Sequence, residues 1–150
     1  MTRQDAVNQV KGLFRSFGQE SGGLNEYGFG GVELGQATIA FEYDEKRQVL
    51  ICHGYVDKWH REPTKGELQA YVQGFLDEEK KGTRTGGGRV NYMPENRGLF
   101  LSREYASPVT DRAFLRDMNS LAAASLYWSR EVFNRVLERM RLAKQLPPYK

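Results

Sequence analysis

The sequence predicts an α+β fold, an antiparallel sheet of about five strands with three helices in the order α-β-β-(β)-α-β-β-α. Three segments repeat apolar residues every three or four positions, which is typical of amphipathic helices. Shorter segments between them alternate apolar and polar residues, as strands with one buried face do. The turns that join successive strands are too short for a parallel crossover, so these strands run antiparallel.

The first helix is expected over residues 5–17, whose apolar residues share one face. Thr2 and Asp5 have the spacing of a capping pair at its start, and Gly18 suits its end. The glycine-rich segment 22–35 comes next. Its pattern leaves open whether it forms a short edge strand or an ordered loop.

Two strands are expected over residues 38–43 and 48–56, joined by a polar turn. Thr64, with Glu67 three positions later, marks the start of the second helix. The apolar face of that helix holds Leu68, Tyr71, Val72, Phe75 and Leu76. Residues 83–88 are expected to form a flexible connection.

A second hairpin is indicated by residues 90–92 and 99–105, which flank the turn 94–98. Thr110 can then cap a last helix that continues to about Lys144, before the two prolines at 147 and 148. A helix of about 34 residues is roughly 50 Å long. Because this exceeds the span of a small sheet, part of its apolar stripe is left for another partner.

Length and composition predict a single domain over residues 1–150, with residues 146–150 as a flexible tail. No apolar signal segment opens the sequence, and the one cysteine, Cys52, cannot form an internal disulfide. We therefore expect a cytoplasmic protein. No segment approaches the ~20 apolar residues of a membrane helix, so no membrane span is expected.

The net charge of +3 is concentrated at the end of the chain. Residues 130–150 hold six cations and two anions, whereas the first 129 residues hold 16 cations and 17 anions. The dipole of the last helix favours cations near its end. Nucleic acid is not the expected partner, because its binding requires basic residues gathered on one broad face.

The residues that could carry chemistry do not form a site. Cys52 and His53 are adjacent in a predicted strand and point to opposite faces, so they cannot converge on one metal ion, and His60 lies outside that strand. The carboxylate pairs 44–45 and 78–79 are expected at a turn and at an exposed helix end, as solvated charges. The glycine runs 28–35 and 83–89 lack the spacing of phosphate-binding loops. The sequence thus predicts no catalytic, metal or cofactor site and no enzyme.

The apolar stripes predict a protein that binds other polypeptide chains. Three helices and a small sheet expose more apolar surface than one core of this size absorbs. Self-association or a surface for a client protein is therefore expected.

The order of the elements resembles the CesT/SycE-like class I chaperones of bacterial type III secretion. The resemblance covers residue 5 to about residue 140, and its most telling part is the strand 98–105 that includes Arg103, the short loop after it, and the acidic start of the last helix at Asp111. It implies a cytoplasmic homodimer without a cofactor that holds an extended segment of a secreted effector.

The resemblance also implies which residues take part. The dimer contact maps to the second helix, at Leu68, Tyr71, Val72 and Phe75. Client binding maps to apolar grooves near the first helix and the sheet, at Leu13, Phe14, Phe17, Ile39 and Phe41. The alternative is a dimeric regulatory or scaffold domain of the same topology, as in the YbjN-like group, without an unfolded client.

Overall fold

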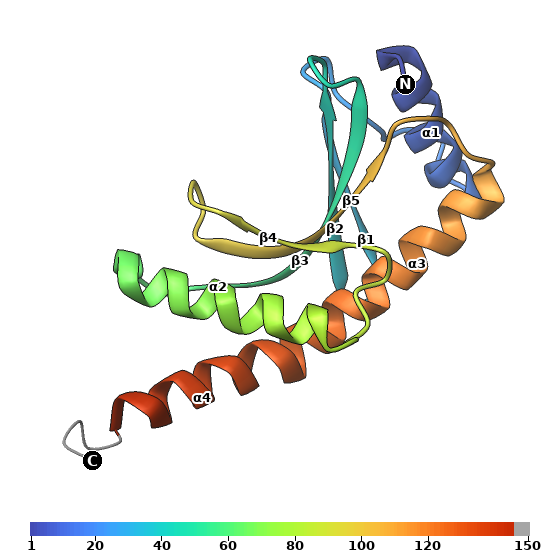
Figure 1. Ribbon diagram of the computed structural model, residues 1–150. Helices are drawn as coiled ribbons and strands as arrows, with labels where there is room; N and C mark the ends of the chain where they lie inside the picture. The colour runs from blue at the N-terminus through green and yellow to red at the C-terminus, as the bar shows by residue number, and fades with distance from the viewer. Residues whose placement is uncertain (146–150) are drawn as a thin grey trace.

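The computed structural model describes residues 1–145 and contains the predicted order of helices and strands (Figure 1). The expected tail, 146–150, lies outside the described residues. The glycine-rich segment that the sequence left undecided supplies the first of five strands. The elements are α1 (Arg3–Ser16), β1 (Phe29–Leu34), β2 (Ala37–Asp44), β3 (Val49–Lys58), α2 (Lys65–Lys80), β4 (Arg89–Met93), β5 (Gly98–Tyr105), α3 (Asp111–Tyr127), a π-helical turn (Trp128–Val132) and α4 (Phe133–Gln145).

The five strands form one antiparallel sheet in the order β1-β2-β3-β5-β4. Ile39 of β2 lies opposite Gly54 of β3, which in turn lies opposite Leu101 of β5. Gly54 has a steric role, because a Cβ there would collide with the Ser125 side chain of α3. The helix therefore lies close against the centre of the sheet.

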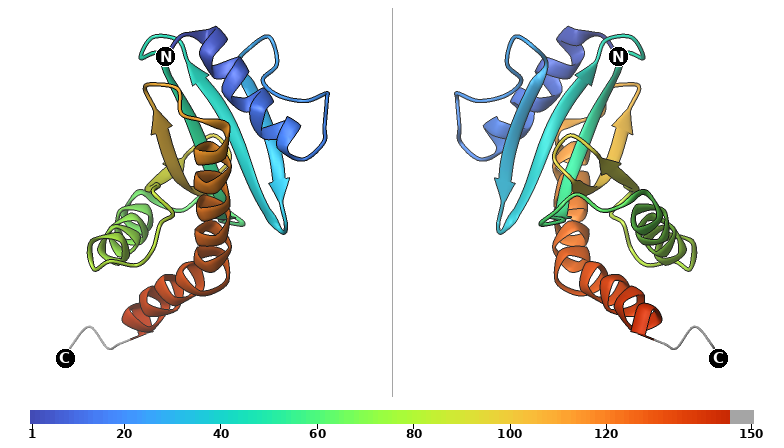
Figure 2. Two further views of the ribbon diagram at one scale, coloured as in Figure 1. Left: turned by 90° about the vertical axis from the view of Figure 1, so that its right-hand side faces the viewer. Right: turned by 90° about the vertical axis from the view of Figure 1, so that its left-hand side faces the viewer.

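Helices α1 and α3 cover one face of the sheet, and the opposite face carries no helix among residues 1–145 (Figure 2). The core between these layers includes Phe41, Phe114 and Trp128, each almost completely buried. α2 lies beside β4 at one end of the sheet and packs on α4 (Figure 1). None of the helices among the described residues has both the length and the apolarity that a membrane crossing needs.

Each helix start follows the predicted capping chemistry. Thr2 and Asp5 form a complete capping box on α1, and Thr64 and Glu67 form another on α2. The Thr110 hydroxyl accepts a hydrogen bond from the Ala113 backbone N–H at the start of α3.

The last helix contains an irregularity that the sequence pattern did not predict. The chain stays helical from residue 111 to 145, but residues 128–132 form a π-helical turn and the helix axis bends there (Figure 1). A π-helical turn adds a residue to the turn and so rotates the residues that follow. As a result α3 packs on the sheet, whereas α4 packs on α2.

Candidate protein-binding surfaces

A groove lies between the end of α1, the β1–β2 turn and the outer side of α3. Its volume is about 500 Å³, and Phe17, Leu34, Ala122 and Leu126 form most of its apolar lining. The Phe17 side chain lies at the C-cap of α1 and is 39% exposed. We call this surface the Phe17 groove. It can accept apolar side chains of another polypeptide.

Of the five residues predicted to bind a client, Phe17 alone presents a large surface. Leu13, Phe14, Ile39 and Phe41 are at most 7% exposed and belong to the core of the protomer. Spacing could not separate these two roles, because a core residue and a surface residue of α1 share the same apolar stripe. The other four residues lie beneath the surface, where they support α1 and the sheet.

The edge of β1 offers backbone groups beside this groove. The Tyr43 N–H donates to the Gly28 carbonyl, so alternate residues from Gly28 onward bond to β2. The residues between them point their N–H and C=O groups outward. Asn25 forms hydrogen bonds with both outward groups of Phe29. The outward N–H and C=O groups of Gly31 and Glu33 have no hydrogen-bond partner within residues 1–145.

The outer side of α2 carries a short apolar stripe. Leu68, Val72 and Leu76 follow one another at four-residue spacing, and Leu76 is 40% exposed. Two of the four predicted dimer residues, Leu68 and Val72, belong to this stripe. The other two point inward: Tyr71 and Phe75 contact Trp59, and Phe75 is fully buried.

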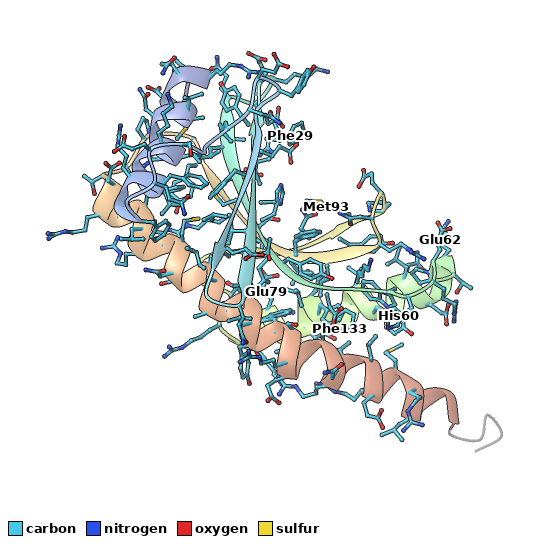
Figure 3. All side chains as sticks on the ribbon, turned by 180° about the vertical axis from the view of Figure 1, so that it is seen from behind. Phe29, His60, Glu62, Glu79, Met93 and Phe133 are labelled. Atoms are coloured by element: carbon cyan, nitrogen blue, oxygen red, sulfur yellow. The ribbon has the colours of Figure 1, made fainter. Side chains whose placement is uncertain are left out.

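The inner side of α2 belongs to an aromatic cluster. Trp59 contacts Tyr71, Phe75, Tyr92 and Phe133, with ring centroids 5.2–6.2 Å apart. Phe133 lies on α4 near α2 (Figure 3). The cluster joins α2, α4 and the sheet, and it covers Phe133 of the apolar stripe on the last helix.

Glu78 corrects the prediction that the carboxylates at the end of α2 are solvated. Its side chain is 1% exposed and accepts hydrogen bonds from Arg135, Arg139 and Thr83, with Lys81 3.1 Å away. Burial opposes ionisation of Glu78, but these donors outweigh it and lower its pKa to about 2. Arg135 and Arg139, two of the cations gathered near the end of the chain, thus bind α4 to α2.

The loop 83–88 makes specific contacts that the flexible-connection hypothesis did not foresee. Trp128 donates its indole N–H to the Arg84 carbonyl, and Arg103 donates to the Gly86 carbonyl. Gly86 has a φ of 64° and lies so close to α3 that a Cβ would collide with the helix backbone. The loop is therefore held against α3.

Arg103, the arginine of the family-like strand, is part of a polar network under this loop. Its guanidinium lies 3.1 Å from Asp117 of α3, and the Tyr105 hydroxyl donates to the same carboxylate. Burial and this hydrogen bond raise the pKa of Tyr105, so the hydroxyl remains protonated. The network fixes the end of β5 to α3.

Cys52 and His53 lie on opposite faces of β3, as predicted. Cys52 is fully buried in the core, and burial raises the pKa of its thiol. His60 is exposed and lies beside α2 (Figure 3). No group of metal-ligating side chains suited to an ion occurs in the part of the chain that the structure describes.

His53 belongs to a hydrogen-bond chain that the sequence interpretation missed. Its Nδ1 lies 2.7 Å from Ser102 Oγ, its Nε2 lies 2.9 Å from Glu42 Oε1, and Asn91 donates to Ser102. Strand alternation could have suggested the chain, because Glu42 and His53 face the same side of adjacent strands. Both ring nitrogens bond within the sheet, so we interpret the chain as a link between strands.

The fold is similar to that of chains solved in two protein complexes. A chain of the ExsC-ExsE complex aligns with a TM-score of 0.65 and 14% identity, covering 87% of this chain and 96% of that chain. A chain of the HopA1-SchA chaperone-effector complex aligns with a TM-score of 0.63 and 12% identity, covering 85% and 95%. No protein-family model matches the sequence, and a search of curated proteins finds no match. The likeness confirms the fold that the resemblance to the CesT/SycE-like chaperones implied.

Proposed function

We propose that this protein is an export-chaperone-like protein that forms a homodimer and holds an extended segment of a secreted effector in the cytoplasm. The observation that carries the proposal is the open edge of β1 beside the Phe17 groove. The fold likeness supports it, since one of the similar structures is a chaperone-effector complex.

An extended client segment fits the β1 edge by strand addition. Gly31 and Glu33 together offer two N–H and two C=O groups, which can pair with a strand of a few residues. β4, the strand at the opposite edge, has α2 packed beside it. A strand on β1 would align with the end of the Phe17 groove, which Glu33 and Leu34 also line.

The Phe17 groove would give the bound strand its apolar contacts. A client side chain there covers Phe17, Leu34 and Leu126 and removes their exposed surface from water. An unfolded client loses conformational entropy when it binds, so backbone pairing and apolar burial both have to contribute.

The apolar stripe of α2 is the proposed dimer contact. Leu68, Val72 and Leu76 would pack against the same stripe of a second copy, since a two-fold interface places a surface against itself. A stable dimer buries about 800 Å² per subunit. The stripe therefore has to be the centre of a wider contact.

Proline substitution at the β1 edge tests client binding. In Gly31→Pro the lost N–H points outward, so the sheet keeps its hydrogen bonds while an added strand loses one. The matched control, Val32→Pro, removes an N–H that bonds to β2 and should destabilise the sheet itself. We expect native co-purification with mass spectrometry to recover a secreted protein with the wild type, and to lose it with a folded Gly31→Pro variant.

Recovery of a folded regulator in place of a secreted protein would favour the regulatory alternative. Equal recovery by wild type and Gly31→Pro would overturn strand addition. Dimerisation is tested separately by sedimentation equilibrium at micromolar concentration. Val72→Asp should yield monomers, whereas Asn8→Asp, the same added charge on the exposed side of α1, should leave the dimer intact.

A further inference from the structure

We propose that the client segment is acidic and that one of its carboxylates enters the cavity lined by Arg84 and Arg103, after the segment crosses α3 at Ala123. The inference rests on the proposed function, because it names the chemistry of the segment that the protein holds. Three features carry it: the cavity itself, its continuity with the Phe17 groove, and the charges around both.

The cavity lies between the loop 83–87 and α3 and has a volume of about 880 Å³. Ala123 and Ala124 form an apolar floor, and Arg84 and Arg103 stand at its walls. Thr85 and Ser120 also line it, and the side-chain hydroxyl of neither residue has a hydrogen-bond partner within residues 1–145. A floor of this kind suits the methylenes of an acidic side chain, and the donors suit its carboxylate.

The cavity and the Phe17 groove meet on α3 at Ala123, where the helix carries a small side chain. Ala123 lines the cavity, the Phe17 groove and a third depression near Leu115. The neighbouring exposed residues of the helix, Asn119 and Ser120, are also small. A segment that leaves the β1 edge near Leu34 can therefore cross α3 without displacing a large side chain.

The surface around this crossing is basic. Arg84, Arg103, Arg112 and Arg116 line the three depressions, against the single carboxylate of Glu33. Arg84 and Arg112 have no ion pair with any described residue, and Arg103 and Arg116 share Asp117. By contrast, Arg135 and Arg139 of α4 are bound to Glu78. Two arginines without an ion pair, Arg84 and Arg112, thus lie beside α3.

This arrangement favours a peptide carboxylate over a nucleic acid. The arginines line depressions that also contain apolar side chains such as Leu115, Ala123 and Ala124, whereas a nucleic-acid footprint spreads cations over one broad face. A guanidinium binds a carboxylate through two parallel hydrogen bonds, which gives direction as well as attraction. A neutral or basic segment would leave Arg84 without a counter-charge.

A displayed library of random peptides about twelve residues long tests the inference without knowledge of the natural client. Selection on the wild type should enrich peptides that join an alternating apolar run to one or two acidic residues. Selection on Arg84→Glu should lose the acidic preference, whereas Lys46→Glu, an equal charge change on the β2–β3 turn, should keep it. For a selected peptide, fluorescence anisotropy should show about tenfold weaker binding to Arg84→Glu.

Ala123→Trp tests the crossing point, because the indole would fill both the groove and the cavity. It should abolish binding of the selected peptides, and Asn134→Trp on the exposed side of α4 should not. Apolar peptides without an acidic preference would overturn this inference and leave the proposed function standing. Failure to select any peptide above background would count against the proposed function itself. Displacement of the peptide by single-stranded DNA at equal affinity would overturn the inference in favour of a nucleic acid.

Discussion

The two edges of the sheet differ in how the residues beside them are packed. At the β4 edge, α2 lies against the strand, the rings around Trp59 pack on one another, and Glu78 binds two arginines of α4. At the β1 edge, the backbone groups of Gly31 and Glu33 have no partner within residues 1–145, and Phe17 is partly exposed. One end of the molecule is closed by its own residues, and the other is open.

The difference separates the residues that maintain the fold from those available for binding. At the closed end nearly every buried polar side chain has a partner, and the exception among described residues is the indole N–H of Trp59. Substitutions there should lower the free energy of unfolding. Substitutions at the open end should leave that free energy nearly unchanged and reduce binding.

The largest expected effect is that of Phe75→Ala at the closed end. Phe75 is fully buried and contacts Trp59, Trp128 and Phe133. Removing its ring leaves a cavity and should lower the free energy of unfolding by about 3–5 kcal/mol. Urea denaturation followed by tryptophan fluorescence measures it, because both tryptophans adjoin Phe75.

Leu76→Ala is the matched control on the same helix. Its side chain is 40% exposed, so the loss should stay below about 1 kcal/mol in the monomer. A Phe75→Ala variant that kept its stability but lost the dimer would place Phe75 in the dimer interface, as the family resemblance implied.

Glu78→Gln has the next largest expected effect. The substitution removes the negative charge that Arg135 and Arg139 share, and we expect a loss of about 2–3 kcal/mol. Glu79→Gln is the control, since Glu79 lies 3.9 Å from a mostly exposed Arg89 and should change stability by less than about 0.5 kcal/mol. Equal losses in the two variants would show that the Glu78 cluster does not hold α4.

Acid unfolding sharpens the same comparison. The pKa of Glu78 is about 2 in the folded protein, below the ordinary value of 4.5. The folded state therefore binds this proton less readily than the unfolded state. The stability it contributes is present above about pH 5 and is lost as pH falls towards 2. Urea midpoints between pH 6 and pH 3 should fall more steeply for the wild type than for Glu78→Gln.

The fold could be predicted from the sequence because its local signals agree with the final packing. Thr2, Thr64 and Thr110 each begin a helix as their capping patterns indicate. The π-helical turn at residues 128–132 could not be predicted, because it depends on where Trp128 packs between α2 and the loop 83–88. Burial of Glu78 likewise depends on Arg135 and Arg139, which lie 57 and 61 residues further along the chain.

The binding surfaces were predictable only at the level of elements. The apolar stripe of α2 was visible, but its spacing gave no means of assigning Phe75 to the core and Leu76 to the surface. The same ambiguity grouped Phe17 with Leu13 and Phe14. Exposure is decided by which elements cover a helix, and that information lies in tertiary contacts.

The smallest expected effect on stability, that of Phe17→Ala, tests the open end. The Phe17 side chain lies at the rim of its groove, outside the buried core, so its loss should change the free energy of unfolding by about 0.5 kcal/mol. Phe14→Ala, one turn earlier and 7% exposed, should cost several times more. If the open end is a binding surface, Phe17→Ala should lose client capture while its urea midpoint stays near that of the wild type. A Phe17→Ala variant as destabilised as Phe14→Ala would show that Phe17 belongs to the core, and the contrast between the two edges would then rest on the β1 backbone alone.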